Sequence, residues 1–372
     1  MAKLGEVCKL NMGQSPDSSS YNDTGDGIPF FQGNADFGEV HPNIRVWCNA
    51  PTKIAHPGEI LISVRAPIGA MNIADCECCI GRGLASISAD EAVCTTKYLW
   101  YGISSKIEEL NAKGTGSTFK AVNKKTLEET EIPIRDLMEQ ERIAAKLDSV
   151  TALITLRKRQ VKKLDELVKA RFVEMFGDPV SNPFNWQTAE LGNRCEIITG
   201  NTPSRAEPEN YGTFIEWIKS DNINTPSTFL TEAQERLSEI GFQKCRFVES
   251  GSLLMTCIAG SLNCIGNVAV ANRRVAFNQQ INAITPTHDN ILYLYWLMIL
   301  SKPTIHRTIN MALKGILSKS QLSLIKFPFP PLPLQNHFAA FVERVDQQKQ
   351  TVQQSLEKLE LMKKALMQEY FG

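Results

Sequence analysis

The sequence carries no net charge and no long hydrophobic run. Forty basic residues balance forty acidic ones, which excludes a protein that binds nucleic acid through bulk positive charge, although local basic patches are not excluded. The most apolar segment, residues 291–300, is too short to cross a membrane and predicts a buried helix. The N-terminal residues lack the apolar core of a signal peptide. We therefore expect a cytoplasmic protein without membrane contact.

Several catalytic motifs are also missing. The chain has no His-Glu-x-x-His motif and no Gly-x-Ser-x-Gly turn, and its Gly-rich segment 114–120 lacks the Gly-Lys-Ser/Thr ending of a phosphate-binding loop. Residues 181–185 contain Asn-Pro-Phe, but an amino-methyltransferase motif would need a second proline. The sequence therefore predicts that this chain is not an enzyme by itself and has no catalytic residue.

The cysteines do not form a recognisable metal motif. "CECC" at 76–79, with Cys94, offers ligand types that zinc accepts. However, no second pair follows at finger spacing, and the second half of the chain does not reproduce the cluster. In a cytoplasmic protein the ten cysteines are expected to be reduced thiols, and we expect no metal site.

What the sequence does contain is an internal repeat. Leu4-Gly5 recurs as Leu191-Gly192, a shift of 187 residues (191 − 4), and "GQSP" at 13–16 then meets "GNTP" at 200–203. Towards the end of each copy the shift becomes 195 (371 − 176). The pairs at that shift include Pro133 with Pro328, Gln140 with Gln335, and Phe176-Gly177 with Phe371-Gly372. The chain is a tandem duplication of about 190 residues.

Each copy ends in a long helical segment with apolar residues at alternating spacings of four and three. At 1.5 Å per residue each helix would be about 55 Å long. The second helix can bury its stripe only against the first, so we expect it to run back antiparallel and form a rod with one domain at each end. The two stripes are Ile143, Leu147, Val150, Ile154, Arg157, Val161, Leu164, Val168, Arg171 and Met175, and Phe338, Val342, Val345, Lys349, Val352, Leu356, Leu359, Lys363, Leu366 and Tyr370.

The remaining sequence alternates short β-rich runs with turns and then a short helical stretch, at 95–110 and at 290–301. This pattern predicts an α+β fold: two similar α+β domains, each with a twisted antiparallel sheet, separated by two long antiparallel coiled-coil helices with pseudo-two-fold symmetry. The predicted boundaries are 1–135 for the first domain, 136–177 for the central helix, 178–186 for the linker, 187–330 for the second domain and 331–372 for the C-terminal helix.

Three segments carry a resemblance to a known family: "GTGSTFKAVNKKTLEETEIPIRDLMEQERIAAKLD" at 114–148, "EMFGDPVSNPFNW" at 174–186 and "GDGIPFFQGNADF" at 25–37. With the duplication, they resemble the specificity (S) subunits of type I restriction–modification systems, over essentially the whole chain. The second copy departs from this pattern, because residues 312–335 hold only a degenerate form of the Gly-rich loop.

The resemblance implies a non-catalytic subunit that reads a bipartite sequence in double-stranded DNA, with one target-recognition domain for each half. It implies that the helices set the spacing and dock methylation (M) subunits, two of them, and that restriction (R) subunits join the complex. The chain itself would bind no cofactor. S-adenosylmethionine, ATP and magnesium would belong to the partner subunits, which would perform adenine-N6 methylation and ATP-dependent cleavage.

Basic residues and the two Gly-x-x-Pro loops are the candidate DNA contacts, because arginine suits bidentate guanine readout and lysine positions the backbone. Any single basic residue is more often a solvated surface charge, and the loops are equally open to interpretation as tight turns. The candidates are Gln14, Ser15, Arg65, Arg82, Lys113, Lys120, Lys124 and Lys125 in the first domain, and Thr202, Arg205, Lys219, Arg273, Arg274, Lys314 and Lys319 in the second.

Two other functions stay open. A structural or adaptor coiled-coil protein with two carbohydrate- or protein-binding domains would show the same duplication and helices. A self-contained restriction or methylation enzyme is disfavoured by the missing motifs.

Overall fold

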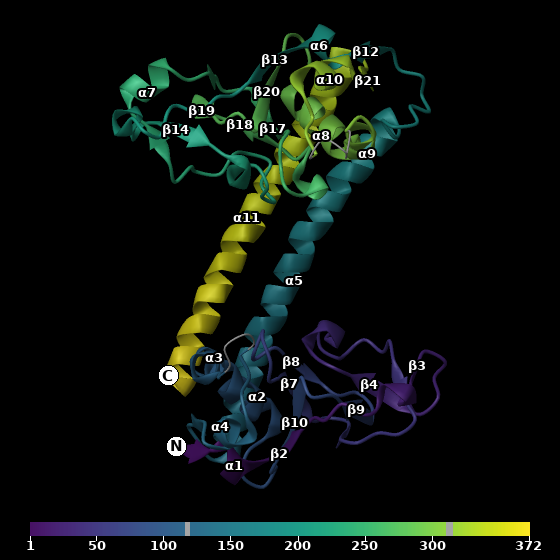
Figure 1. Ribbon diagram of the computed structural model, residues 1–372, viewed down its shortest axis with the longest axis vertical. Coiled ribbons are helices and arrows are strands. Elements are labelled where there is room, and N and C mark those ends of the chain that lie inside the picture. Colours follow the sequence, from purple (N-terminus) through teal and green to yellow (C-terminus); the bar gives the residue numbers. More distant parts are fainter. Residues whose placement is uncertain (116–119, 310–314) are drawn as a thin grey trace. The chain divides into compact units, whose positions relative to one another are not determined.

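The structure, a computed structural model, describes residues 1–115, 120–309 and 315–372 (Figure 1). Its contacts divide the chain into two compact units. The first unit comprises residues 1–158 and 354–372, and the second comprises residues 159–353. Two helices of 40 residues each, α5 (Leu137–Phe176) and α11 (Leu332–Phe371), contribute to both units. In the described ranges, no helix is both long enough and apolar enough to span a bilayer.

The first unit contains an antiparallel sheet covered on one face by helices. Ile60, Ile62 and Ile87 alternate with side chains on the opposite face, and they pack with Tyr98 and Leu147 in one core. The sheet has the order β2 (Cys8–Met12), β10 (Leu84–Ala89), β7 (Ile60–Ser63) and β8 (Met71–Ile73). Its neighbours are α1 (Leu4–Val7), α2 (Thr96–Ser105), α3 (Ile107–Lys113), α4 (Lys124–Glu128) and the pair β1 (Ala2–Lys3) and β11 (Glu131–Ile132).

A second sheet of the first unit lies to the side of the first, at β3, β4 and β9 in Figure 1. Its order is β3 (Tyr21–Asn22), β5 (Trp47–Cys48), β4 (Ile28–Phe31), β9 (Cys78–Ile80) and β6 (Ile54–Ala55). Strands β4 and β9 pair in parallel, so the prediction of an antiparallel sheet is right for the first sheet and wrong for this one. A parallel pair needs a long crossover, and here strands of the first sheet lie within that crossover.

The second unit repeats this plan. Its first sheet has the order β13 (Cys195–Thr199), β20 (Ile281–Pro286), β17 (Ser252–Thr256) and β18 (Val268–Ala271). Its second sheet has the order β15 (Arg236–Leu237), β14 (Tyr211–Ile218), β19 (Val275–Phe277) and β16 (Phe247–Val248), and β14 and β19 are again parallel. Also present are α6 (Leu191–Arg194), α7 (Glu239–Gln243), α8 (Ile291–Leu300), α9 (Lys302–Arg307), α10 (Lys319–Leu324) and the pair β12 (Thr188–Glu190) and β21 (Lys326–Pro328). The predicted α+β internal repeat is confirmed.

The repeat extends to individual buried hydrogen bonds. The Tyr98 hydroxyl donates to the Pro133 carbonyl at 2.9 Å, and the Tyr293 hydroxyl donates to the Pro328 carbonyl at 2.8 Å. Both pairs are related by the shift of 195 residues found in the sequence. The buried glutamines follow the same rule: Gln140 Oε1 accepts from Thr95 N at 2.9 Å, and Gln335 Oε1 accepts from Asn290 N at 2.9 Å.

The repeated Phe-Gly ending closes each long helix inside the unit built mainly from the other copy. The ring of Phe176 lies 5.0 Å from that of Tyr293 in the second unit, and the ring of Phe371 lies 4.9 Å from that of Tyr98 in the first. After Phe176, Gly177 has φ +78°, the left-handed conformation that ends a helix. Each copy therefore supplies a helix end to the core of the other copy's domain.

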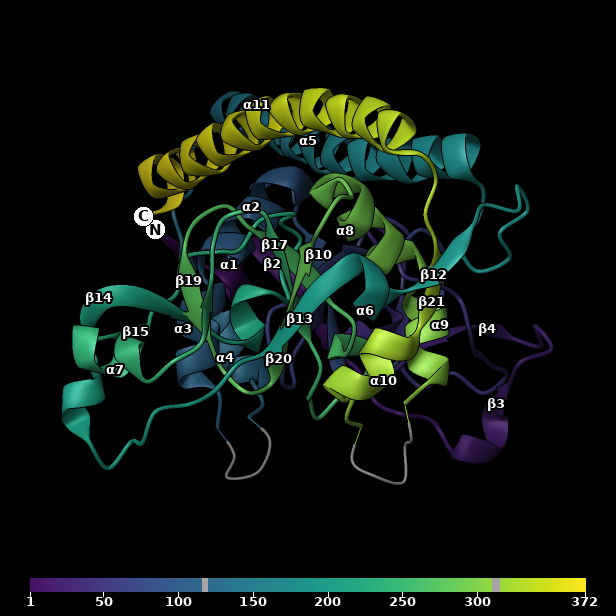
Figure 2. The same cartoon turned by 90° about the horizontal axis from the view of Figure 1, so that it is seen from above.

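Helices α5 and α11 run antiparallel within each unit. The contacts are Lys146 Nζ with Tyr370 Oη at 3.0 Å and Lys158 with Glu360 at 2.9 Å in the first unit, and Asp165 with Lys349 at 2.7 Å in the second. The expectation that the second helix buries its stripe only against the first is wrong, because Phe338 and Val342 of α11 also join the core around Tyr293. Figure 2 shows α8 between α11 and the strands β13 and β20.

The short helical stretches are each interrupted. The stretch predicted at 95–110 forms α2 and α3, which are separated at Lys106 with φ −103° and ψ 4°. The stretch at 290–301 forms α8 and is followed by α9, which begins at Lys302 with Pro303 in its first turn. Proline is accepted there because its missing N–H would have no partner in a first turn.

Candidate nucleic-acid interface

In each unit, the Gly-x-x-Pro loop is held against the turn that joins the second sheet to the first. In the first unit, Gly13 N donates to Leu84 O at 2.9 Å and Gln14 N donates to Ile80 O at 3.0 Å. A Cβ on Gly13 would lie 2.2 Å from the carbonyl oxygen of Gly81. Glycine is therefore required by the close approach of two backbones.

The second unit builds the same junction from the second loop. Gly200 N donates to Ile281 O at 3.0 Å and Asn201 N donates to Phe277 O at 3.1 Å, and a Cβ on Gly200 would lie 2.2 Å from Asn278 O. In both loops, the amides of the first two residues already have backbone partners. If the loops contact DNA, they do so through side chains. We call the junction formed by 13–16 with 81–83, or by 200–203 with 278–280, the paired turn.

The paired turn of the first unit borders a cavity of about 440 Å³. Three predicted residues, Ser15, Arg65 and Arg82, line it together with Tyr21 and Gln32. Both arginines are exposed, and neither guanidinium has a hydrogen bond or ion pair with a residue that the structure describes. Two guanidinium groups without a nearby acidic partner favour an anionic ligand at this surface.

Lys120 lies on a segment that pairs with the backbone at Arg65. Its carbonyl oxygen accepts from Ala66 N at 3.1 Å, and Ala121 forms a β-bridge with Arg65. Its side chain is exposed. The structure thus brings Lys120 beside Arg65, although the two are far apart in sequence.

The remaining basic candidates of the first unit lie on short helices and have acidic partners one turn away. The pairs are Lys113 with Glu109 at 2.6 Å, Lys124 with Glu128 at 3.3 Å and Lys125 with Glu129 at 3.7 Å. Exposed i,i+4 pairs of this kind stabilise a helix by only a few tenths of a kcal/mol, about 0.3–0.5. These ion pairs do not decide whether the lysines contact DNA. A DNA phosphate would replace each glutamate as the partner at little cost in free energy.

Arg273 in the second unit has a structural role, because its guanidinium group is hydrogen-bonded within the unit. Its Nε and Nη2 atoms donate to the two carboxylate oxygens of Glu216 at 2.7 and 2.6 Å, and Nη2 also donates to Thr231 O at 3.0 Å. The hydrogen bonds from Arg273 lower the pKa of the Glu216 carboxyl. Arg273 therefore links the strand β14 to the segment that precedes β19, and little of its donor capacity is left for a ligand.

Arg205 and Lys219 share one carboxylate. Both contact Glu235, with Arg205 at 3.0 Å, and both lie over the ring of Trp217, at 5.7 and 5.3 Å from its centroid. Burial alone would raise the pKa of Glu235, but the hydrogen bonds from Lys219 and Arg205 outweigh it and lower the pKa. Arg274 has a similar partner in Glu249 at 2.6 Å. Four predicted cations of the second unit, Arg205, Lys219, Arg273 and Arg274, are thus already paired with carboxylates.

Two basic residues of the second unit lie beside β13. Lys319 and Arg246 line a cavity of about 430 Å³ with Glu196 and Thr199, and Arg246 donates to the Thr199 carbonyl at 2.6 Å. Arg246 was not among the residues predicted from the sequence to contact DNA. The Thr202 hydroxyl donates to the side chain of the exposed Gln279. Gln279 was also not among the predicted DNA contacts. Lys314 lies outside the described residues.

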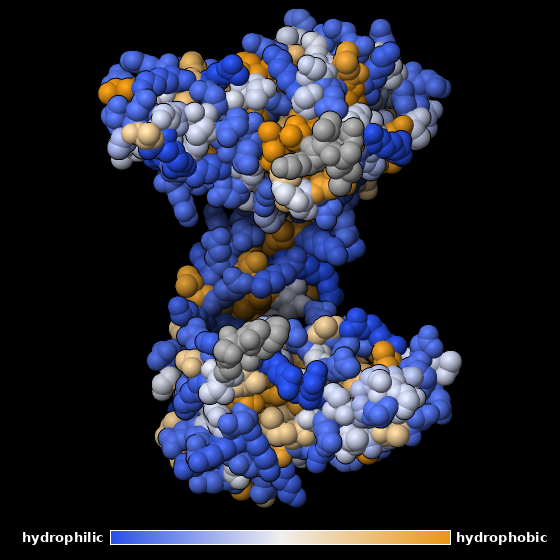
Figure 3. Space-filling view, in the orientation of Figure 1, coloured by the Kyte–Doolittle hydropathy of each residue, from blue (hydrophilic) through white to orange (hydrophobic). Residues whose placement is uncertain are grey.

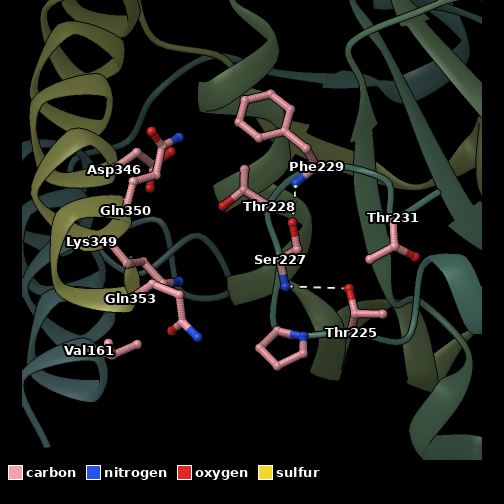
Figure 4. Close-up of a pocket in the computed structure, with 11 residues that line it drawn as sticks. Val161, Thr225, Ser227, Thr228, Phe229, Thr231, Asp346, Lys349, Gln350 and Gln353 are labelled. Carbon is pink, nitrogen blue, oxygen red and sulfur yellow. Dashed lines mark hydrogen bonds between the residues drawn. The ribbon is translucent and has the colours of Figure 1, made fainter. Parts of the chain in front are cut away.

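A separate pocket of about 380 Å³ lies in the second unit between residues 225–231 and the long helices. In Figure 4, Lys349, Gln350 and Gln353 of α11 lie across the cavity from Ser227. Burial raises the pKa of the Asp346 carboxyl at this pocket. Hydroxyl and amide side chains contribute to the lining, but most of the exposed surface of the pocket is apolar, so the lining does not select a particular ligand chemistry.

The cysteines lie mainly in the cores. All ten are free, and Cys78 and Cys79 are fully buried. Burial raises the pKa of the Cys78 thiol to about 12, which disfavours the thiolate that a metal would need. Within residues 1–115, 120–309 and 315–372, no group of three or more His, Cys, Asp or Glu residues is arranged to hold a metal ion.

The comparisons with known proteins agree on one family. A family model described as "Type I restriction modification DNA specificity domain" matches residues 1–166 and 183–361. The chain is similar to the putative type I restriction enzyme MjaX specificity subunit of Methanocaldococcus jannaschii, with 42% identity over 43% of this chain and 38% of that protein. It is also similar to the type I restriction enzyme EcoBI specificity subunit of Escherichia coli, with 21% identity over 92% of this chain and 78% of that protein.

The fold has a solved counterpart. An S subunit of a type I restriction–modification system from M. genitalium matches with a TM-score of 0.61 and 16% identity, covering 100% of this chain and 95% of that chain. At this identity the likeness shows the fold alone. The matched stretch of the M. jannaschii protein is about two fifths of that protein's length.

Proposed function

Because the chain belongs to the family of type I restriction–modification DNA specificity domains, we propose that it is a DNA sequence-specificity subunit. Each unit reads one half of a bipartite target in double-stranded DNA. The observation that carries this proposal is the paired turn, which occurs once in each unit on the same backbone scaffold and displays different exposed side chains. A reader of two different half-sites needs one scaffold and two sets of reading residues.

The first unit supplies a suitable DNA-binding surface. Arg65 and Arg82 line one cavity, and their guanidinium groups have no acidic partner in the described part of the chain. Lys120 is exposed on the segment that pairs with the backbone at Arg65. Phosphate neutralisation supplies most of the non-specific affinity for DNA, while base contacts supply specificity. Arginine can do either, and lysine mainly the first.

The chain has no catalytic role in this proposal. What supports this is the lack of methyltransferase and nucleotide-binding motifs in the sequence. S-adenosylmethionine, ATP and magnesium are bound by the methylation and restriction subunits with which the chain assembles. The assembled complex methylates adenine at N6 and cleaves DNA.

The long helices carry the partner subunits and set the spacer. Exposed apolar side chains on a helix mark a protein interface, and Leu361 is 67% and Leu156 54% exposed. Leu153 and Met362 are exposed nearby on the same two helices, and hydrophobic side chains are visible along these helices in Figure 3. We assign this surface to a methylation subunit, with a second subunit on the repeat-related surface.

The direct test is a methylome map. The gene is deleted from its host and then restored, and methylated adenines are located in both genomes. We expect one bipartite motif to lose methylation on deletion and regain it on restoration. An unchanged methylation pattern would rule out the specificity role and favour the adaptor alternative.

A further inference from the structure

The two paired turns are equivalent at the level of single backbone hydrogen bonds. Strand pairing fixes the correspondence, because Leu84 pairs with Ser63 and Ile281 pairs with Thr256 in the same antiparallel arrangement. Beyond the glycine contacts described above, two further bonds recur. They are Leu84 N to Gly81 O at 2.9 Å and Val64 N to Gly83 O at 2.9 Å in the first unit, and Ile281 N to Asn278 O at 3.2 Å and Cys257 N to Gln280 O at 2.8 Å in the second.

This correspondence places Arg82 and Gln279 at the same point of the fold, the middle residue of the turn. Both side chains are exposed. Each turn also contacts the matching residue of its Gly-x-x-Pro loop: Arg82 N donates to Ser15 Oγ at 3.3 Å, and Thr202 Oγ1 donates to Gln279 Oε1. A fixed backbone aims both side chains outward at low entropic cost, which is the condition for selective recognition.

The chemistry at this position differs between the units. Arginine can donate two hydrogen bonds to O6 and N7 of guanine, and glutamine can donate to N7 and accept from N6 of adenine. A clamp for the phosphate backbone would be expected to keep a positive charge in both copies. The charge is lost at Gln279 while the scaffold is kept, which favours contact with bases over contact with phosphate.

We propose that Arg82 reads a guanine in one half-site and that Gln279 reads an adenine at the corresponding place of the other half-site. This inference rests on the proposed function and adds the base identity and the residue that selects it. Arg65 is the alternative reader in the first unit, because it lines the same cavity. The test must therefore separate Arg82 from Arg65.

The experiment is selection from a pool of randomised DNA duplexes. The full chain is purified from its source cells with the subunits that accompany it, as wild type and as the Arg82→Gln, Arg82→Lys, Arg65→Gln and Gln279→Arg variants. Lys97→Gln, which removes an exposed charge paired with Asp148, is the charge control. Thermal melting confirms that each variant is folded.

We expect the wild type to select a bipartite motif. Arg82→Gln and Arg82→Lys should reduce the preference for guanine at one position of one half-site by about 5- to 150-fold, the range for loss of a bidentate contact. Gln279→Arg should reduce the preference for adenine at one position of the other half-site by a similar factor. Lys97→Gln should leave every preference unchanged.

Two results overturn the inference while the proposed function stands. In the first, wild type selects a bipartite motif, and the Arg82 and Gln279 variants select the same motif with the same base preferences. The other is loss of the guanine preference in Arg65→Gln but not in Arg82→Gln. If the wild type selects no motif, both the inference and the proposed function are wrong.

Discussion

Gly13 and Gly200 allow two backbone segments to meet at a distance that a side chain would prevent. In Gly200→Ala the new Cβ would lie 2.2 Å from Asn278 O and 2.4 Å from Phe277 O. Because backbone atoms cannot move aside cheaply, we expect a loss of about 1–3 kcal/mol in the free energy of unfolding, measured by chemical denaturation.

Gly260→Ala is the matched control in the same unit. A Cβ there has no other atom within 4 Å, so the change should be within about 0.5 kcal/mol of wild type. Equal stability of the two variants would show that the close approach at Gly200 does not restrict this position.

The raised pKa of Asp346 makes the stability of the second unit depend on pH. Burial raises its carboxyl pKa, Lys349 lowers it, and Asp165 and Glu343 raise it further. The folded chain therefore binds more protons than the unfolded chain between the ordinary pKa of 3.8 and the raised value, and stability falls as pH rises through that window.

Asp346→Asn removes this pH-dependent contribution to stability. We expect the variant to have a higher melting temperature than wild type at pH 7 and a difference that shrinks as the pH approaches 3. The measurement is a series of melting curves of both proteins across that range. A difference that grows towards low pH would contradict the raised pKa.

At the scale of single residues, charge alone was enough to select Arg65 and Arg82 as candidate DNA contacts, which stay predictions, whereas partners that are distant in sequence could not be predicted. Arg65 and Arg82 were predicted as DNA contacts from their charge and lie on one surface. The pairing of Arg273 with Glu216 could not be predicted, because the two are 57 positions apart. Gln279 carries no charge, and only its alignment with Arg82 through the repeat, at a shift of 197 (279 − 82), would have revealed it.

The ends of the long helices are elements on which the cores depend. Phe371 is 1% exposed and packs in the first unit, and Phe176 is 3% exposed and packs in the second. Truncation of a buried phenylalanine costs about 3–5 kcal/mol. We expect Phe371→Ala to reduce hydrogen-exchange protection in the first unit, and Phe176→Ala to reduce it in the second.

Phe184→Ala is the control, because Phe184 is 52% exposed in the linker. It should leave protection unchanged in both units. If Phe371→Ala weakened the second unit as much as the first, the assignment of each helix end to one core would be wrong.

At the scale of elements, local patterns predicted helices better than sheets. The alternating spacing and the closing glycine located α5 and α11 because helical contacts are local. The parallel pairing of β4 with β9 depends on segments about 50 residues apart and has no local signal. The interruption at Lys106 was also not predicted, because lysine itself is a good helix former and the serines before it are only moderately weaker ones.

For the whole molecule, the proposed ruler can be tested by insertion. Adding one heptad between 158 and 159 of α5 and one between 353 and 354 of α11 lengthens both helices by about 10 Å, close to three base pairs of DNA. The spacer of the methylated motif should grow by a few base pairs with both half-sites unchanged. Insertion into α5 alone is the control, and it should destabilise the helix pair by breaking its register.

The two halves of the target are read independently if each domain has its own core and reading residues. The hydrophobic cores support this view: the cluster around Tyr98 and the cluster around Tyr293 share no residue. Each unit also has its own paired turn.

Methylome mapping of a one-domain chimera tests this claim most directly. Residues 187–327 are replaced by the matching domain of a related specificity subunit, and methylated adenines are mapped in cells that contain the chimera and its methylation subunits. We predict that one half-site changes to that of the donor while the other half-site stays the same. A change in both half-sites would show that the two domains read DNA jointly and would contradict the account.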